Sequence, residues 1–180
     1  MVLNSVEILR VGKEAKAFDA PQEFLDGVNN VEKRKEEAAA AIEAKIDAMY
    51  PEAQKTESGL RYIIEEQGTG VKPEIGQVVD VHYAGYLTDG TCFDTSIKGL
   101  AQKLGNYDER REPYDPFPVT CGPNGRVIQG WKEGIQLLNV GGKAKLIIPP
   151  YLGYGDRGAG GVIPPNATLV FDIELVGIKK

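Results

Sequence analysis

The chain has 180 residues, enough for one domain of ordinary size and an additional segment. Hydrophobic residues make up 42% and charged residues 26%, which is the balance of a folded globular chain, and 22 glycines with 11 prolines indicate many turns. The formal net charge of −5 gives no electrostatic reason to expect nucleic acid or an anionic membrane as a partner. No apolar run approaches the roughly 20 residues that a membrane-spanning helix needs.

Groups that could support metal or nucleophilic chemistry are scarce in this sequence. His82 is the single histidine, and the two cysteines, Cys92 and Cys121, form no Cys-x-x-Cys pair. The glycine-rich segment 153–161 is followed by two prolines rather than by a helix start, which argues against a phosphate-binding loop. We therefore expect an activity that uses no metal, no nucleotide and no other cofactor.

The first part of the chain divides into two segments. Residues 1–20 contain a short strand-like run, 6–11, without a neighbouring run that could pair with it. Residues 21–54 are predicted as a helical arm and linker, in which Pro51 ends the helix and 27–30 is a candidate break. Residues at steps of three and four along one face of this arm are Val31, Lys35, Ala38, Ile42, Ile46 and Met49.

From residue 55 to residue 180 the hydrophobic period changes from 3.6 to 2, which predicts strands. Strands are expected at 60–64, 79–83, 92–94, 117–121, 143–148 and 168–175, with a hairpin turn at Asp89-Gly90. Only one helical pattern, around Ile128, Trp131 and Ile135, interrupts them. The sequence thus predicts an α+β domain, in which an antiparallel sheet is wrapped over one short helix and its second face is solvated.

Aromatic residues and one carboxylate are the candidate functional groups of this domain. Asp94 follows Phe93 directly within an apolar strand, so it either needs a hydrogen-bonding partner or lies exposed at the strand end. Each aromatic residue alone could equally be a core residue. The aromatic residues spread over the predicted strands, helix and loop are Tyr83, Phe93, Phe117, Trp131, Tyr154 and Phe171.

Five sequence blocks resemble the signature blocks of FKBP-type peptidyl-prolyl cis-trans isomerases, in the family's order and with similar spacing. They are 81–87 (VHYAGYL), 93–96 (FDTS), 127–134 (VIQGWKEG), 154–155 (YG) and 163–175 (IPPNATLVFDIEL). The likeness covers about residues 56–180. It implies an FKBP-like antiparallel sheet curled around one short helix, with an apolar pocket between them that accelerates rotation about Xaa-Pro bonds during protein folding.

The resemblance also assigns roles to individual residues. It implies a pocket with an aromatic floor and walls, a rim, and a flap, in which Ile128 N–H and Tyr154 O–H donate hydrogen bonds to the peptide and Asp94 packs behind Tyr83. The residues expected to carry the reaction are Tyr83, Asp94, Ile128, Tyr154 and Phe171. The residues expected to bind substrate are Phe93, Phe117, Val127, Trp131 and Ile163.

The implied reaction fits the scarcity of titratable groups. Rotation about an Xaa-Pro bond faces a barrier of ~18–20 kcal/mol because resonance gives the C–N bond partial double-bond character. No bond is made or broken, so neither a nucleophile nor a proton shuttle is required. Proline-containing peptides and unfolded chains are the expected partners, and macrolide ligands of the family are possible ones.

Three features leave alternatives open. An insertion at about 97–115 borders the implied pocket and is either decoration or a substrate-selecting element. The helical arm either packs on its own sheet or serves a homodimer, as in the periplasmic folding factors that such chains resemble, in which case a weakly catalytic or non-catalytic chaperone is the alternative function. Residues 4–12 resemble the last strand of a cyclophilin domain, which would make the chain the C-terminal part of a bacterial cyclophilin–FKBP fusion.

Overall fold

The computed structural model describes residues 20–179, which fall into two compact units divided between Ala41 and Ile42. The strand expected within residues 1–20 lies outside the described residues. No helix within the described range is long and apolar enough to cross a membrane. The elements, in chain order, are α2 (Ala20–Met49), β1 (Gln54–Lys55), β2 (Arg61–Glu66), β3 (Val78–Leu87), β4 (Cys92–Thr95), α3 (Lys98–Leu104), η1 (Glu109–Arg111), β5 (Phe117–Thr120), α4 (Gln129–Ile135), β6 (Lys143–Ile148), η2 (Pro150–Leu152) and β7 (Leu169–Ile178).

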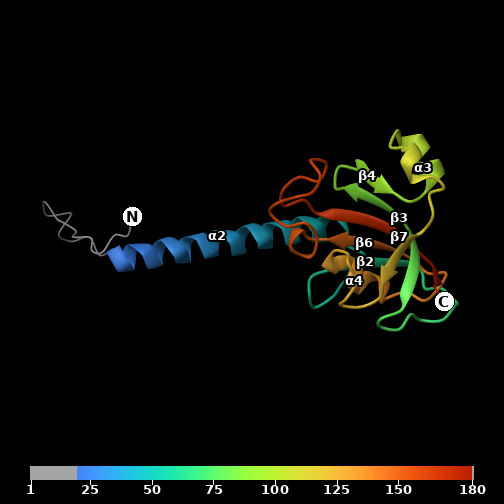
Figure 1. Ribbon diagram of the computed structural model, residues 1–180. Coiled ribbons are helices and arrows are strands. Elements are labelled where there is room, and N and C mark those ends of the chain that lie inside the picture. The colour runs from blue at the N-terminus through green and yellow to red at the C-terminus, as the bar shows by residue number, and fades with distance from the viewer. Residues whose placement is uncertain (1–19, 180) are drawn as a thin grey trace, which may run out of the picture. The chain divides into compact units, whose positions relative to one another are not determined.

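The seven strands form one antiparallel sheet in the order β1-β2-β6-β7-β3-β4, with β5 paired to β3 (Figure 1). The alternation predicted for the last strand is confirmed, because Leu169, Phe171 and Ile173 belong to the main core, which lies on the inner face of the sheet. Val170, between them, belongs to a second apolar cluster, as expected from the strand period of two. The α+β fold predicted from the sequence is therefore confirmed.

The short helix α4 packs closely on the inner face of the sheet because it carries glycines where it meets β6. A Cβ atom at Gly134 would lie 2.3 Å from Leu146, and one at Gly130 would lie 2.7 Å from Ile148. This approach buries Trp131, which lies between the two glycines and is 4% exposed. Each glycine weakens a helix by about 1 kcal/mol relative to alanine. At Gly130 and Gly134 this cost is offset by the close packing of α4 on the sheet, which a larger side chain would prevent.

The outer face of the sheet is not wholly solvated, contrary to expectation. Ile42 and Ile46, in the last turns of α2, pack with Ile147 and Val170 in the second apolar cluster. The α2 helix is continuous from Ala20 to Met49, so the break considered at 27–30 is wrong. Covering part of the second sheet face removes apolar area from water at roughly 25 cal/mol per Å².

Within the compact unit of residues 42–180, Arg61 at the start of β2 joins the last turns of α2 to the sheet. Its side chain is 1% exposed and donates to Asp47 at 2.8 Å and to the Gly59 carbonyl at 3.0 Å. Glu43 lies 3.4 Å from the same guanidinium and also accepts a hydrogen bond from the Tyr151 hydroxyl at 2.7 Å. A buried guanidinium needs such partners, since a buried charge left unpaired costs several kcal/mol.

The insertion contains the helix α3 and the short 3-10 turn η1. Within it, the Tyr107 and Tyr114 rings stack with centroids 5.7 Å apart, and the Tyr114 hydroxyl accepts a hydrogen bond from the Asp108 backbone N–H at 2.8 Å. Lys98 and Glu112 form an ion pair at 2.7 Å. These contacts fix the position of η1, and with it Arg111, the last residue of that turn.

Candidate active site

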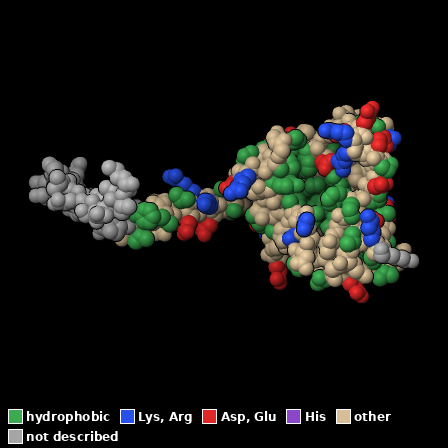
Figure 2. Space-filling model, in the orientation of Figure 1, with side chains coloured by type: hydrophobic (Ala, Val, Ile, Leu, Met, Phe, Trp, Pro, Cys, Tyr) green, Lys and Arg blue, Asp and Glu red, His purple; other side chains and the backbone are tan. Residues whose placement is uncertain are grey.

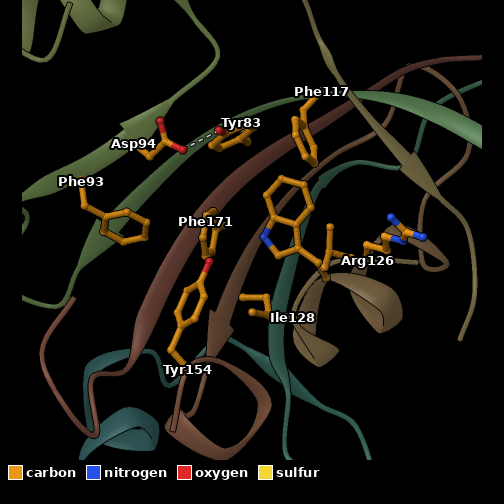
Figure 3. Close-up of a pocket in the computed structure, with 10 residues that line it drawn as sticks. Tyr83, Phe93, Asp94, Phe117, Arg126, Ile128, Tyr154 and Phe171 are labelled. Carbon is orange, nitrogen blue, oxygen red and sulfur yellow. Dashed lines mark hydrogen bonds between the residues drawn. The ribbon is translucent and has the colours of Figure 1, made fainter. Parts of the chain in front are cut away.

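A cavity of about 220 Å³ lies between the sheet and α4 (Figure 3). Hydrophobic side chains gather on this face of the domain, with Lys and Arg side chains around them (Figure 2). The aromatic residues that line the cavity are Tyr83, Phe93, Phe117, Trp131, Tyr154 and Phe171. The other lining residues are Asp94, Arg126, Val127 and Ile128.

The aromatic rings come from five different elements and from the segment after η2, and five of the six ring contacts between them are edge to face. The Trp131 ring is 5.1 Å from Tyr83 and 5.3 Å from Phe171, at interplanar angles of 75° and 87°. Phe93 meets Phe171 at 5.5 Å and 84°. Edge-to-face pairs stabilise each other by about 0.5–1.5 kcal/mol beyond their burial. The rings thus hold one another in fixed orientations around the cavity.

Close approach of Phe93 and Phe171 depends on Gly85 in β3. In the sheet, Gly85 of β3 is paired with Phe171 of β7 on one side and with Asp94 of β4 on the other. A Cβ atom at Gly85 would lie 2.7 Å from both phenyl rings. The absence of a side chain at this position therefore leaves room for two of the cavity's rings.

Asp94 has two hydrogen-bonding or ionic partners, and its side chain is also 43% exposed, so it combines the two alternatives that the sequence left open. The Tyr83 hydroxyl donates a hydrogen bond to Asp94 Oδ2 at 2.6 Å (Figure 3), and Arg111 of the insertion forms an ion pair with Asp94 Oδ1. Arg111 also donates to the Tyr83 hydroxyl at 3.1 Å. Burial, followed by the hydrogen bond to Asp94, raises the pKa of Tyr83 to about 12. The tyrosine thus stays protonated at neutral pH.

Two polar hydrogens at the cavity are available to a ligand, those of the Ile128 N–H and the Tyr154 O–H. The Ile128 N–H, directly before α4, makes no hydrogen bond within the described part of the chain. The Tyr154 hydroxyl points into the pocket toward Phe171 (Figure 3), and burial raises the pKa of this group. The buried Trp131 indole N–H has no hydrogen-bond partner among residues 20–179. A buried donor without a partner costs about 1–3 kcal/mol, and this indole nitrogen has no accessible surface at which a ligand could bind.

The structure brings together nine of the ten residues expected at the site. Ile163 is not among the lining residues; it is buried in the adjoining core, and its backbone pairs with Ala159. Sequence reasoning missed two arginines, Arg111 and Arg126. Arg111 stood in a charged patch of the insertion, and only the fold shows which of its charges faces Asp94. Arg126 directly precedes the block that starts at Val127, so that adjacency was an available signal.

An antiparallel sheet over the short helix α4, with an aromatic cavity between them, defines the class of FKBP-fold domains. Residues 69–176 match the model of the FKBP-type peptidyl-prolyl cis-trans isomerase family, which is 60% of the chain. The chain belongs to this family, as its resemblance in sequence indicated.

Individual relatives agree with the family assignment. The chain is 41% identical to the FKBP-type peptidyl-prolyl cis-trans isomerase FkpA of Aeromonas hydrophila, over 94% of this chain and 61% of that protein. It is 46% identical to FK506-binding protein 1 of Dictyostelium discoideum, over 67% of this chain and 99% of that protein. The crystal structure of FkpA from Escherichia coli is similar with a TM-score of 0.60 and 33% identity, over 94% of this chain and 74% of the other.

Coverage differs between these relatives. The chain spans 61% and 57% of the FkpA proteins of Aeromonas hydrophila and Neisseria meningitidis, whereas it spans nearly all of the Dictyostelium protein. The shared part is therefore the isomerase-type domain, and in the FkpA proteins also a segment before it.

Proposed function

We propose that this protein is a peptidyl-prolyl cis-trans isomerase that accelerates rotation about Xaa-Pro bonds in proline-containing peptides and unfolded chains. The observation that carries the proposal is the aromatic cavity of about 220 Å³, closed at its floor by Trp131 and walled by Tyr83 and Phe171. A pyrrolidine ring is apolar and compact, and such a cavity is suited to bind it. Membership of the isomerase family supports the same activity.

Catalysis of this rotation requires binding the twisted amide more tightly than either planar isomer. The planar amide carries charge separation between oxygen and nitrogen, which water stabilises. Withdrawal of the amide into a cavity lined by rings removes that water, and the resonance that keeps the bond planar is weakened. The Ile128 N–H and the Tyr154 O–H stand at the cavity edge, where they can hold the flanking peptide carbonyls while the bond rotates.

Asp94 has an indirect role in this mechanism. Its two oxygens are taken up by Tyr83 and Arg111, so it does not act on the substrate as an acid or a base. It holds the Tyr83 hydroxyl, and thereby the ring, at one wall of the cavity. Ile163 does not contact the substrate in this proposal; it packs in the core next to the cavity and supports the segment that carries Tyr154.

Substitution of the cavity rings tests this function. Phe171→Ala removes one wall, and we expect it to lower kcat/KM for a Leu-Pro peptide at least about tenfold while the protein stays folded, as judged by circular dichroism. Trp131→Ala is expected to act in the same direction. Val176→Ala in the same strand, which alters a 42% exposed residue, is the matched control and should leave the rate unchanged. Full activity in folded Phe171→Ala would contradict the assigned pocket.

A second function is favoured by the first part of α2, and we infer that it forms a homodimer through which the protein holds unfolded chains. Phe24 is 71% exposed and Val31 is 50% exposed, and both line one apolar groove with Val28. Contiguous exposed apolar side chains on a soluble chain mark interaction sites. A chaperone that binds without turnover is the alternative to the isomerase.

The mass of the protein in solution tests this second function. Light scattering should give twice the chain mass for the full chain and the monomer mass for a chain that begins at Ile42, which keeps the compact unit 42–180 intact. Phe24→Glu with Val31→Glu should have the same effect as truncation. A monomeric full chain would exclude the dimer. Suppression of aggregation by Phe171→Ala protein would separate the holding function from the isomerase.

The interpretation of residues 4–12 as the last strand of a cyclophilin domain stays a prediction. Those residues lie outside the described part of the chain, and the family match begins at residue 69. Macrolide binding by the pocket also stays a proposal, supported by the aromatic lining of the cavity.

A further inference from the structure

Only two of the residues that line the cavity carry a charge, Asp94 and Arg126. The Asp94 carboxylate is already paired within the chain, because Arg111 forms an ion pair with one oxygen and Tyr83 donates a hydrogen bond to the other. A charged group on a bound peptide therefore meets no uncompensated carboxylate in the cavity lining. Arg126 is left as the charge that such a group encounters.

Arg126 has no partner of its own. Its side chain is exposed, and within residues 20–179 its guanidinium forms no ion pair and no hydrogen bond. It lies two residues before Ile128, at the opposite side of the pocket from Phe93, and its guanidinium is directed away from the rings (Figure 3). The group is thus at the rim, outside the space that a proline ring would fill.

We propose that Arg126 selects prolyl peptides that carry an aspartate or glutamate one or two residues away from the proline. This inference rests on the proposed isomerase function of the same cavity. An extended peptide advances about 3.3 Å per residue, so a rim arginine is within reach of side chains adjacent to the bound proline but not of the proline itself. A guanidinium presents paired N–H donors that match a carboxylate, which makes it the side chain best suited to recognise one.

The overall charge of the protein cannot produce this preference. The chain carries a net charge of −5, so its general field disfavours acidic peptides. A preference for acidic peptides must then come from a local cation. Because Arg126 is exposed, the effect is limited to the range measured for exposed ion pairs, which corresponds to about two- to fivefold in kcat/KM.

The test compares three peptides that differ in one residue next to a Leu-Pro unit, which is Glu, Gln or Lys, placed before the Leu in one series and after the Pro in another. Exchange rates are measured by NMR at low ionic strength, where exposed charges are least screened. We expect kcat/KM in the order Glu, Gln, Lys in at least one series for the unsubstituted protein. Arg126→Gln should equalise the three peptides, and Arg126→Glu should reverse the order.

Arg34→Gln is the matched control, since it makes the same change in net charge at an exposed residue of α2. It should leave the Glu preference intact. Equal rates for Glu, Gln and Lys peptides in the unsubstituted protein, or a Glu preference that survives in Arg126→Gln, would overturn the inference while leaving the isomerase function in place. Failure to accelerate even the neutral Gln peptide would instead refute the proposed function itself, and the inference with it.

Discussion

The Tyr83 hydroxyl donates a 2.6 Å hydrogen bond to Asp94, and so joins the wall of the cavity to a carboxylate that the insertion holds through Arg111. β3 supplies the tyrosine, β4 the aspartate and η1 the arginine. The insertion is thus not independent of the site. The short turn η1 of the insertion fixes the orientation of the Tyr83 ring, because Arg111 contacts both Asp94 and the Tyr83 hydroxyl.

Loss of this hydroxyl should lower stability. We expect Tyr83→Phe to reduce the free energy of unfolding by about 1–2 kcal/mol, because the hydrogen bond to a charged group is lost while Asp94 keeps Arg111 as a partner. Urea unfolding measures the change. Tyr107→Phe is the control, since it removes a hydroxyl bonded to the exposed carboxylate of Glu112, and it should cost less than about 0.5 kcal/mol. Equal losses of unfolding free energy in the two variants would mean that the Tyr83–Asp94 hydrogen bond stabilises the protein no more than the exposed Tyr107–Glu112 bond.

Catalysis should not depend on pH where the site tyrosines stay protonated. Burial raises the pKa of both Tyr83 and Tyr154 above the ordinary value of 10. The proposed mechanism transfers no proton, so kcat/KM should be constant between about pH 7 and pH 9. The measurement is the exchange rate of a neutral peptide over this range. A bell-shaped profile would indicate acid–base catalysis and contradict the mechanism.

Gly85→Ala should impair the site more than it impairs the fold. A Cβ atom there would lie 2.7 Å from the rings of Phe93 and Phe171, so one ring must move and the cavity changes shape. We expect kcat/KM to fall about tenfold or more, with a stability loss of about 1–3 kcal/mol from overpacking. Gly177→Ala in β7 is the matched control, because a Cβ atom at that glycine meets nothing within 4 Å. Wild-type activity in folded Gly85→Ala protein would show that these rings do not define the catalytic cavity.

Glu43→Gln should change how stability depends on acid. Hydrogen bonds from Lys55 and then Tyr151 lower the pKa of Glu43 from 4.5 to about 2. A carboxylate whose pKa is lowered by folding contributes stability that is complete above its unfolded value and is lost as pH falls through its folded value. The stability advantage of the unsubstituted protein over Glu43→Gln should therefore be constant above about pH 4.5 and shrink from there toward pH 2.

Urea unfolding between pH 2 and pH 7 measures this difference. Glu57→Gln, which makes the same change at an exposed carboxylate of the same compact unit, is the matched control for the substitution itself. An advantage over Glu43→Gln that does not change with pH would mean that Glu43 gains nothing from Lys55 and Tyr151.

Much of the sheet could be predicted from the sequence because alternation is a local signal. β7 shows it most clearly, since Phe171 and Ile173 face the core while Val170 faces outward. The assembly of the aromatic cavity could not be predicted in that way. Phe93 and Phe171 lie far apart in the sequence and meet through the register of β3 with β4 and β7, so only the resemblance to a family placed them together.

The solvated outer face, which was wrongly predicted, and the role of Arg111, which was missed, both depend on contacts between segments that are distant in the sequence. The outer sheet face was expected to be solvated because its own residues alternate cleanly, and nothing local to the sheet indicates that Ile42 and Ile46 cover part of it. Arg111 is one of five charged residues at 108–112, and nothing local to that segment indicates which of them pairs with Asp94. Its importance follows from the path of the insertion, which returns η1 to Asp94.

The most direct test of the account is the cis–trans exchange rate of a Leu-Pro peptide, measured by NMR without a coupled protease, with the protein alone and with a macrolide ligand of the FKBP family. We expect the protein to accelerate exchange, and we expect the acceleration to be lost when the macrolide occupies the cavity. Absence of acceleration by folded protein that still binds the macrolide would contradict the isomerase function and leave a pocket that binds without turnover.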